Sequence, residues 1–341
     1  MKGTPNSPRL SVVVATRNDD HGGNPLQRTQ AMVNALGRQH RRLGPDVELI
    51  VVEWNPPPDR PPLRDAMQWS AAPPTRVITV PAAVHGRYEH AAALPLFQMI
   101  AKNVGIRRAR GDFVLATNID ILLSDELAAW LASGAIPARR MVRVDRLDVP
   151  AEGAAMSADE VLAWCRANVI RANERMGTRD LRTGGLHRVY KPTTWRDVLT
   201  SVGLRRPTTH TRLHTNACGD FTLLPRAGWE AIRGYAELAM YSMHLDSVAC
   251  HAAHHAGFRE LVLRPPLACY HLEHAPGSGF APEHQRELDQ RLAQSGVPQL
   301  EHRTFAQWAL QMRTRRTAMR FNGDDWGLAQ EALPEEEVVP R

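Results

Sequence analysis

The N-terminal third of the chain alternates short apolar runs with a helical pattern, and this order most restricts its fold. Residues 10–15, 47–52 and 76–80 are rich in β-branched and apolar side chains, and residues 26–43 carry a helical pattern. Apolar runs of this kind suit strands that are buried on both faces, and strand–helix–strand units pair such strands in parallel. The sequence therefore predicts an α/β fold with a mixed, mostly parallel sheet flanked by helices.

The overall composition is that of an ordinary globular enzyme. The chain has 341 residues, of which 43% are hydrophobic and 23% charged, enough to bury one large core or two smaller ones. Its 42 basic and 36 acidic residues give a net charge of +6. There is no long Lys/Arg run, and aromatic residues make up only 6% of the chain. We therefore expect no nucleic-acid partner.

Cysteine usage and apolar patterning indicate the compartment. Four widely spaced cysteines, with no C-x-x-C pair, argue against a disulfide framework and favour a reducing environment. No apolar stretch approaches the roughly 20 residues that span a bilayer, and the N-terminal apolar run is too short for a signal peptide. We expect a cytoplasmic protein without a membrane span, and the sequence leaves homo-oligomerisation open.

Beyond Trp130 the pattern changes. Residues 141–149 alternate as a half-exposed strand would, and residues 157–175 resemble an amphipathic helix that opens with a Ser157–Glu160 capping box. Residues 176–215 predict a long loop or lid. Further on, a helix is expected over 245–257, started by Asp246 and stopped by Gly257, followed by a strand over 259–263. The tail predicts one or two helices.

Residues 102–127 carry the most specific functional signal. A polar helical pattern runs into Gly111 and a short apolar strand, which leads to Asn118-Ile119-Asp120 and a helix capped by Ser124. An acidic residue at the carboxyl end of a buried strand commonly holds a divalent metal over a phosphate-binding crevice. The sequence contains no G-x-G-x-x-G after a strand, no Walker-type loop, no H-E-x-x-H and no G-x-S-x-G.

This segment resembles the metal-binding segment of GT-A-type glycosyltransferases of the inverting, family-2-like kind. There a similar helix, glycine and strand lead into a D-x-D motif, and Asn118 stands here in place of the first aspartate. The resemblance implies a divalent metal, Mn²⁺ or Mg²⁺, held by Asp120, with Asn118 contacting the ribose. His271 and His274 follow the last predicted strand, where metal-dependent members often supply a histidine ligand.

Two further segments resemble the nucleotide-binding parts of the same family. The end of the first strand, Thr16-Arg17-Asn18-Asp19, would hold base and ribose, and Glu53 at the end of the second strand would contact the base. Residues 102–105, Lys-Asn-Val-Gly, look like the A-R-N-x-G helix beside the pyrophosphate, which gives Lys102 and Asn103 substrate-binding roles.

The remaining matches concern the sugar and the acceptor. Asp220, within Cys-Gly-Asp-Phe, resembles the segment that faces the transferred sugar, and Asp246 matches the aspartate of the family's E-D motif, with Leu245 in place of the glutamate. In inverting members this aspartate is the general base, because an acceptor hydroxyl must lose its proton as it attacks the anomeric carbon.

The resemblance implies a GT-A-like (Rossmann-like) fold and transfer of a hexosyl or N-acetylhexosaminyl group from a nucleotide-diphosphate sugar, UDP-sugar favoured, to an acceptor hydroxyl. The catalytic domain would cover 1–275, with a nucleotide-sugar half over about 1–130 and an acceptor half over 131–275. An insertion would occupy 150–205. Residues 276–341 would form a C-terminal helical extension.

Other interpretations stay open. A sugar nucleotidyltransferase also uses an α/β sheet and a metal-bound nucleotide, and the Arg-rich 171–215 segment would suit a non-enzymatic, polyanion-binding protein. Asp120 could be only a turn residue, and Asp246 only a helix cap. The histidines at 251, 254 and 255 are expected on a solvated or interface face. His210 and His214, four residues apart, are expected in a loop.

Overall fold

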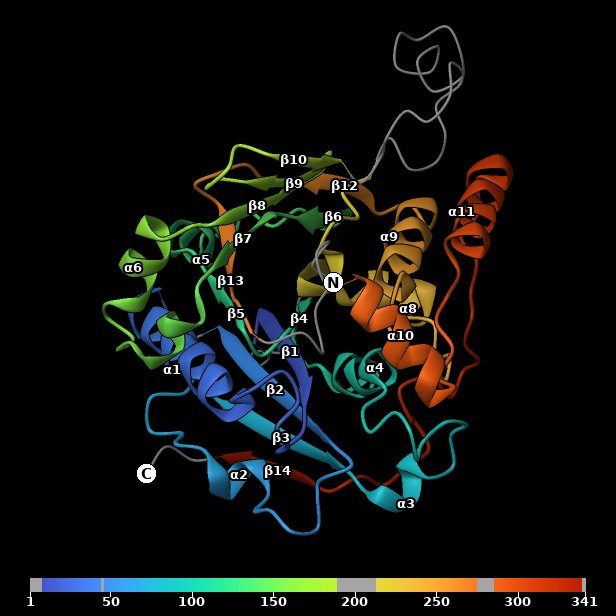
Figure 1. Ribbon diagram of the computed structural model, residues 1–341, viewed down its shortest axis with the longest axis horizontal. Coiled ribbons are helices and arrows are strands. Elements are labelled where there is room, and N and C mark those ends of the chain that lie inside the picture. Colours follow the sequence, from blue (N-terminus) through green and yellow to red (C-terminus); the bar gives the residue numbers. More distant parts are fainter. Residues whose placement is uncertain (1–7, 44–45, 189–212, 275–284, 339–341) are drawn as a thin grey trace, which may run out of the picture.

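The computed structural model describes residues 8–43, 46–188, 213–274 and 285–338, and its main sheet has eight strands. The strands run in the order β12-β6-β11-β4-β1-β2-β3-β14 (Figure 1). Their bounds are β1 (Leu10–Thr16), β2 (Val47–Trp54), β3 (Thr75–Val80), β4 (Phe113–Thr117), β6 (Arg140–Arg143), β11 (Phe221–Pro225), β12 (Arg259–Val262) and β14 (Glu335–Val338). The four central strands are parallel, and β11 and β14 flank them in antiparallel orientation. The predicted α/β class is confirmed.

The central strands bury both faces, because successive side chains of a strand point to opposite sides. Val13 and Ile50 face one core, which is covered by helix α4 (Gln98–Arg108). Val12 and Leu49 face the other, which is covered by α1 (Pro25–Leu43). Figure 1 shows these two helices on opposite sides of β1 and β2.

Gly105 explains how closely α4 lies against the sheet. A Cβ atom at this position would lie 2.5 Å from Cγ1 of Val13. A larger residue would therefore force the helix away from the strands.

A second sheet has the order β10-β9-β8-β7-β13-β5 and was not expected. Its strands are β5 (Ile121–Leu123), β7 (Asp145–Val149), β8 (Arg171–Glu174), β9 (Gly177–Asp180), β10 (Leu186–Arg188) and β13 (Ala268–Leu272). Only β7 and β13 are paired in parallel, and the other neighbours are antiparallel. The protein thus joins a mostly parallel sheet to a mostly antiparallel one.

Two predictions between residues 141 and 175 are wrong. The alternating stretch is not one half-exposed strand: it breaks at Val144 into β6 and β7, which are largely buried and belong to different sheets. The expected long helix is limited to α6 (Val161–Ala167), and residues 171–173 pair with β7 instead. Tertiary pairing overrides the helical pattern here. The Ser157 hydroxyl donates to Glu160 and caps no backbone group.

The predicted lid over 176–215 contains regular structure in its described part, where β9 and β10 form a hairpin. Residues 189–212 lie outside the described residues. The remaining helical elements are α2 (Leu63–Ala66), α3 (Ala82–His85), α5 (Asp125–Ala132), η1 (Ala151–Ala155), η3 (Cys218–Asp220), α8 (Arg226–Ile232), α9 (Leu245–His255), α10 (Gln285–Ser295) and α11 (His302–Arg315).

The predicted start of helix α5 is confirmed, whereas that of helix α9 differs from the structure. Ser124 caps α5 as expected, since its Oγ accepts from the Leu127 N–H at 3.1 Å. In helix α9 the N-cap position is occupied by His244, at a φ of 64° and without a side-chain capping hydrogen bond, and Asp246 lies in the first turn. Gly257 follows the helix with a φ of +98°, a conformation that favours glycine.

The tail contains the two expected helices and one unexpected strand. β14 extends the main sheet beside β3, although its sequence is acidic and gives no strand signal. Arginines compensate for the charge: Glu335 contacts Arg76 and Glu337 contacts Arg110. The expected C-terminal helical extension over 276–341 thus contains two helices, and its last described residues form a strand. Within the described ranges, no helix has both the length and the apolar character for crossing a membrane.

Candidate active site

A cleft of about 310 Å³ opens where the two sheets meet. Residues at or just beyond the carboxyl ends of β1, β4 and β13 line it, which is where ligands bind in open α/β sheets. Helix α10 of the tail supplies another wall through Arg291 and Leu292. The polar lining includes Asp19, His21, Arg28, Gln98, Asn118, Asp120, Arg146, Asp220, His271 and His274.

Asp120, His271 and His274 converge in this cleft, as predicted for the metal ligands. A backbone hydrogen bond brings the two segments together, because the Leu272 N–H donates to the Asp120 carbonyl at 3.0 Å. Asp120 Oδ2 lies 3.2 Å from Nε2 of His274 and 3.9 Å from Nε2 of His271. The two ring nitrogens are 3.3 Å apart. One ligand atom from each residue lies within 4.8 Å of the others.

The surroundings of the Asp120 carboxylate suit the binding of a cation. Burial alone would raise its pKa, but a hydrogen bond from His274 and the charges of both histidines and Arg28 outweigh burial and lower the pKa. Among the described residues, no hydrogen-bond partner reaches its buried oxygen Oδ1. A buried carboxylate oxygen without a donor calls for a further positive partner. Two imidazoles and one carboxylate can supply ligands to a transition metal.

Sequence reasoning missed Arg28, which contacts this cluster. Its Nη1 donates to Asp120 Oδ2 at 2.7 Å, and the side chain is almost wholly buried. The signal was spacing, because Arg28 precedes Met32 and Leu36 at intervals of four along the buried face of α1. A charged residue in such a row indicates a buried partner.

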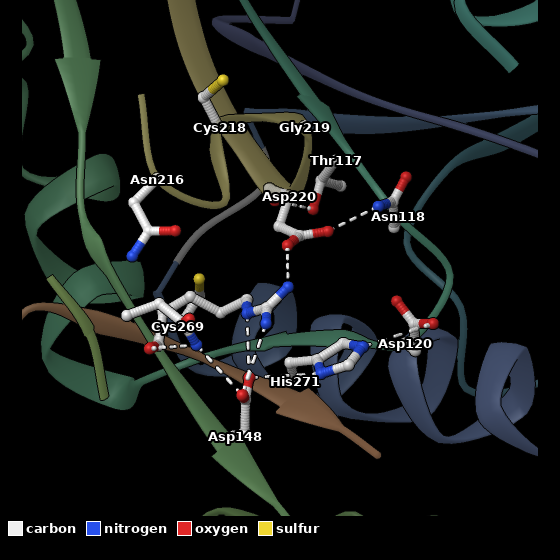
Figure 2. Close-up of polar contacts among 12 residues, drawn as sticks. Thr117, Asn118, Asp120, Asp148, Asn216, Cys218, Gly219, Asp220, Cys269 and His271 are labelled. Carbon is white, nitrogen blue, oxygen red and sulfur yellow. Dashed lines mark hydrogen bonds and ion pairs between the residues drawn. The ribbon is translucent and has the colours of Figure 1, made fainter. Parts of the chain in front are cut away.

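Asp220 holds a second polar cluster together (Figure 2). Its Oδ1 accepts from Nδ2 of Asn118 at 2.5 Å, and its Oδ2 accepts from Nη1 of Arg146 at 2.6 Å. Gln98 donates to Oδ1 of Asn118 at 3.0 Å. Both carboxylate oxygens of Asp220 are therefore engaged within the protein, and the Asn118 amide is fixed in orientation beside the metal-type cluster.

Arg146 and Asp148 were also missed by sequence reasoning. They are two residues apart in β7, so their side chains share one face of the second sheet. Arg146 Nε lies 2.8 Å from Asp148 Oδ1, and both side chains are buried. The alternation of charged and apolar residues in Arg-Leu-Asp-Val could have shown that the two side chains share one face of a strand. It could not have shown that this face borders the cleft.

The predicted nucleotide-binding segment lies at the end of β1, and Asp19 lines the cleft. Asp19 contacts Arg17 at 3.1 Å and also His21. Burial would raise its pKa, but the contacts with His21 and Arg17 lower it. Arg17 donates to the Pro95 carbonyl, and the buried Asn18 donates to the Pro61 carbonyl at 2.8 Å. Thr16 is buried as well.

Glu53 supports a loop in this structure. Its Oε1 accepts from the Leu63 N–H at the start of α2, at 2.9 Å. Burial raises its pKa. The side chain is not part of the cleft lining, so contact with a base stays a prediction.

Lys102 and Asn103 are bonded to other parts of the protein, and their contact with a substrate stays a prediction. Lys102 is 0% exposed and donates from Nζ to the Gly219 carbonyl at 2.8 Å, and burial lowers its pKa to about 8. The Asn103 amide donates to the Tyr235 carbonyl and to Glu237, and accepts from the Tyr235 N–H. Both side chains tie α4 to the later segment 219–237.

Asp246 lies beside the turn that carries Asp220. It is half-buried, and its Oδ1 accepts from the Ser247 N–H at 2.7 Å. Its Oδ2 lies 3.0 Å from the position that a Cβ on Gly219 would occupy. Asp246 is next to the cleft but not in its lining, so its role as a base stays a prediction.

The histidines of α9 are partly or wholly buried. His251 is 3% exposed and packs against Phe305 of α11, so the solvated part of the expected solvated or interface face is wrong for it, whereas His254 and His255 are half-buried. His214 is buried, with Nε2 at 2.9 Å from Oδ1 of Asp145. His210 lies outside the described residues.

Three arginines in the described part of the Arg-rich segment form ion pairs. Arg171 contacts Glu273, Arg175 contacts Glu260 and Arg179 contacts Glu174. These glutamates neutralise the charge of those three arginines.

Comparisons with known proteins give limited guidance. No family model matches the chain, and no curated protein matches it. The chain is similar to the crystal structure of S. aureus TarS 1–349, with a TM-score of 0.46 and 14% identity over 90% of this chain and 71% of that one. For the same protein in complex with UDP, the TM-score is 0.44 at 14% identity, over 90% and 72%. For the catalytic domain of Drosophila beta1,4galactosyltransferase 7 in complex with xylobiose, it is 0.36 at 10% identity, over 82% and 79%. The functional assignment therefore rests on the site residues.

Proposed function

We propose that this protein is a GT-A-type glycosyltransferase, which transfers a sugar from a nucleotide-diphosphate sugar to an acceptor hydroxyl with inversion. The observation that carries the proposal is the convergence of Asp120, His271 and His274 in a polar cleft next to the ends of parallel strands. A UDP-sugar of hexosyl or N-acetylhexosaminyl type is the favoured donor.

The donor would lie across the ends of β1 and β4. Asp19 and Asn118 line the cleft there, and Asn118 presents an amide that can hydrogen-bond a ribose hydroxyl. Arg28 and Arg146 add two buried guanidinium groups to the same lining, and both are paired with carboxylates there. Their positive charge favours a diphosphate in the cleft. Thr16, Arg17 and Asn18 support this edge from within the fold.

The three converging side chains fit a divalent metal. Asp120 offers an oxygen without a hydrogen-bond partner among the described residues, and the two imidazoles face it. This donor set favours Mn²⁺ over Mg²⁺, because imidazole is a poor magnesium ligand. When bound, the metal would offset the negative charge on the departing diphosphate. Arg28 adds a fixed positive charge on the same carboxylate.

Asp246 is proposed as the general base. Its carboxylate would take the proton of the acceptor hydroxyl as the acceptor oxygen bonds to the anomeric carbon, and the nucleoside diphosphate would leave with the bonding electron pair. Gly219 supports this role, because a side chain there would bring its Cβ within 3.0 Å of Oδ2 of Asp246.

We assign catalysis to residues 1–275 and treat 276–341 as an extension that completes the site. Arg291 and Leu292 of α10 line the cleft, and β14 adds a strand to the main sheet. The tail would thus border the substrate.

The test is a thermal-shift panel of UDP, GDP and CDP with and without Mn²⁺. Ligand at 100 times its Kd stabilises the folded state by about 2.7 kcal/mol. UDP with Mn²⁺ should raise the Tm of the wild type, and Asp120→Asn should lose the Mn²⁺-dependent part. No shift with any nucleotide would refute the proposal.

The base assignment has its own test. Asp246→Asn should keep the nucleotide-induced shift and lose transfer, because the amide cannot accept the proton. Turnover equal to the wild type would rule Asp246 out as base. Measuring nucleoside diphosphate against pyrophosphate as product separates glycosyl transfer from nucleotidyl transfer.

A further inference from the structure

The register of the second sheet places a row of charged residues beside the metal-type cluster. His271 of β13 lies opposite Asp148 of β7, and Asp148 lies opposite Arg171 of β8. Residues in register on adjacent strands point to the same face of a sheet. The register therefore sets Asp148 directly between His271 and an arginine.

The side chains of His271 and Asp148 are in contact, as this register allows. His271 Nδ1 lies 3.3 Å from Asp148 Oδ1, an ion-pair contact drawn in Figure 2, and among the described residues neither atom has a hydrogen-bond partner. The other ring nitrogen, Nε2, lies on the side of His274 and Asp120, at 3.3 and 3.9 Å. The imidazole thus has one nitrogen on a buried carboxylate and the other in the cluster.

We propose that Asp148 is a positioning residue: in the metal-loaded protein it accepts a hydrogen bond from Nδ1–H of His271, which holds the ring so that Nε2 presents its lone pair to the metal. The inference rests on the proposed function and concerns this chain's own contribution to the metal site. Carboxylates in this position fix the tautomer and orientation of a ligating histidine and raise its basicity.

Asp148 is itself held rigidly. Its Oδ2 accepts from Nδ2 of Asn173 at 3.0 Å and from Nε of Arg171 at 3.1 Å, and Arg146 Nε contacts its Oδ1. The side chain is 1% exposed. These contacts anchor the carboxylate, so a change at Asp148 could act through folding alone, and the test needs a control for that.

Asp145 provides the matched control. It lies in the same strand, is similarly buried, and contacts a histidine, His214, at 2.9 Å. Neither Asp145 nor His214 belongs to the cleft lining. Asp145→Asn therefore repeats the loss of a buried carboxylate beside an imidazole without touching the cluster.

The experiment measures Mn²⁺ affinity of the full chain by calorimetry and by electron paramagnetic resonance of free Mn²⁺. Asp148→Asn should weaken binding by about 10- to 100-fold, and Asp145→Asn should change it less than about twofold. Wild-type affinity in folded Asp148→Asn, or equal weakening in both variants, overturns the inference. A wild type that binds no Mn²⁺ also overturns it, while the nucleotide-shift panel reports separately on the proposed function.

A second measurement needs no folded Asp148 variant. In the Zn²⁺-loaded wild type with ¹⁵N-labelled histidine, His271 should show a protonated Nδ1 and a metal-bound Nε2. His271→Gln identifies the signal by its disappearance. The reversed pattern, with the proton on Nε2, overturns the inference.

Discussion

Lys102 offers the sharpest test of how the two halves of the protein are joined. Its Nζ is fully buried on the Gly219 carbonyl, and burial lowers its pKa from 10.5 to about 8. Each tenfold change in the protonation equilibrium corresponds to about 1.4 kcal/mol, so keeping the charge buried at pH 7 costs about 3 kcal/mol. Lys102→Met removes this cost and also a hydrogen bond worth about 1 kcal/mol.

The sign of the pH dependence follows from linkage. Between pH 8 and 10.5 the unfolded chain keeps the proton on Lys102 while the folded protein has lost it. The free energy of unfolding of the wild type therefore rises with pH in this window, relative to a variant without the amine. Lys102→Met should be the more stable protein at pH 7 by about 1–2 kcal/mol, and this advantage should disappear by pH 10.

Urea denaturation of both proteins at pH 7 and pH 10 measures this difference, and groups common to both cancel. The change between the two pH values should be about 2–3 kcal/mol in favour of the wild type. A stability difference that does not vary with pH would refute the reasoning. Affinity for UDP should stay within about twofold, because Lys102 has no exposed surface; a tenfold loss would restore the original prediction of nucleotide contact.

Two further predictions concern a close contact and a buried ion pair. Gly234→Ala should lower the free energy of unfolding by about 2–4 kcal/mol, because a Cβ would lie 2.3 Å from Asn103 Oδ1 at a φ of +73°. Gly184→Ala is the control: its φ is +72° but the space around it is open, so it should lose clearly less stability, and equal losses would exclude the clash. Arg76→Met should lower the free energy of unfolding by about 3–5 kcal/mol, because it leaves Glu48 buried without its ion pair. Arg64→Met, which removes an exposed pair with Glu336, should change stability little. Urea denaturation midpoints of the two variants measure the difference.

Much of the central sheet could be predicted from local sequence. The apolar runs at 10–15, 47–52 and 76–80 correspond to β1, β2 and β3, because strands buried on both faces must be continuously apolar. Ser124 capped its helix as expected, since capping depends only on the next three residues.

The second sheet was missed in part because β7 and β8 have no such apolar signal. β7 and β8 carry Arg, Asp, Asn and Glu, whose charges are neutralised across strands and not by solvent. The same reason hid β14, where three glutamates contact arginines from other parts of the chain. Pairing between distant segments leaves no local pattern.

The sequence by itself determined the α/β class, the strand that precedes Asp120 and the histidines placed near it, because these depend on short-range patterns and on residue chemistry. Only the tertiary structure decided which polar groups face the cleft. It turned Lys102 and Asn103 inward, brought Arg28 onto Asp120, and set Asp148 beside His271 through strand register. These contacts join segments far apart in the chain, and their energies depend on burial, which no local pattern encodes.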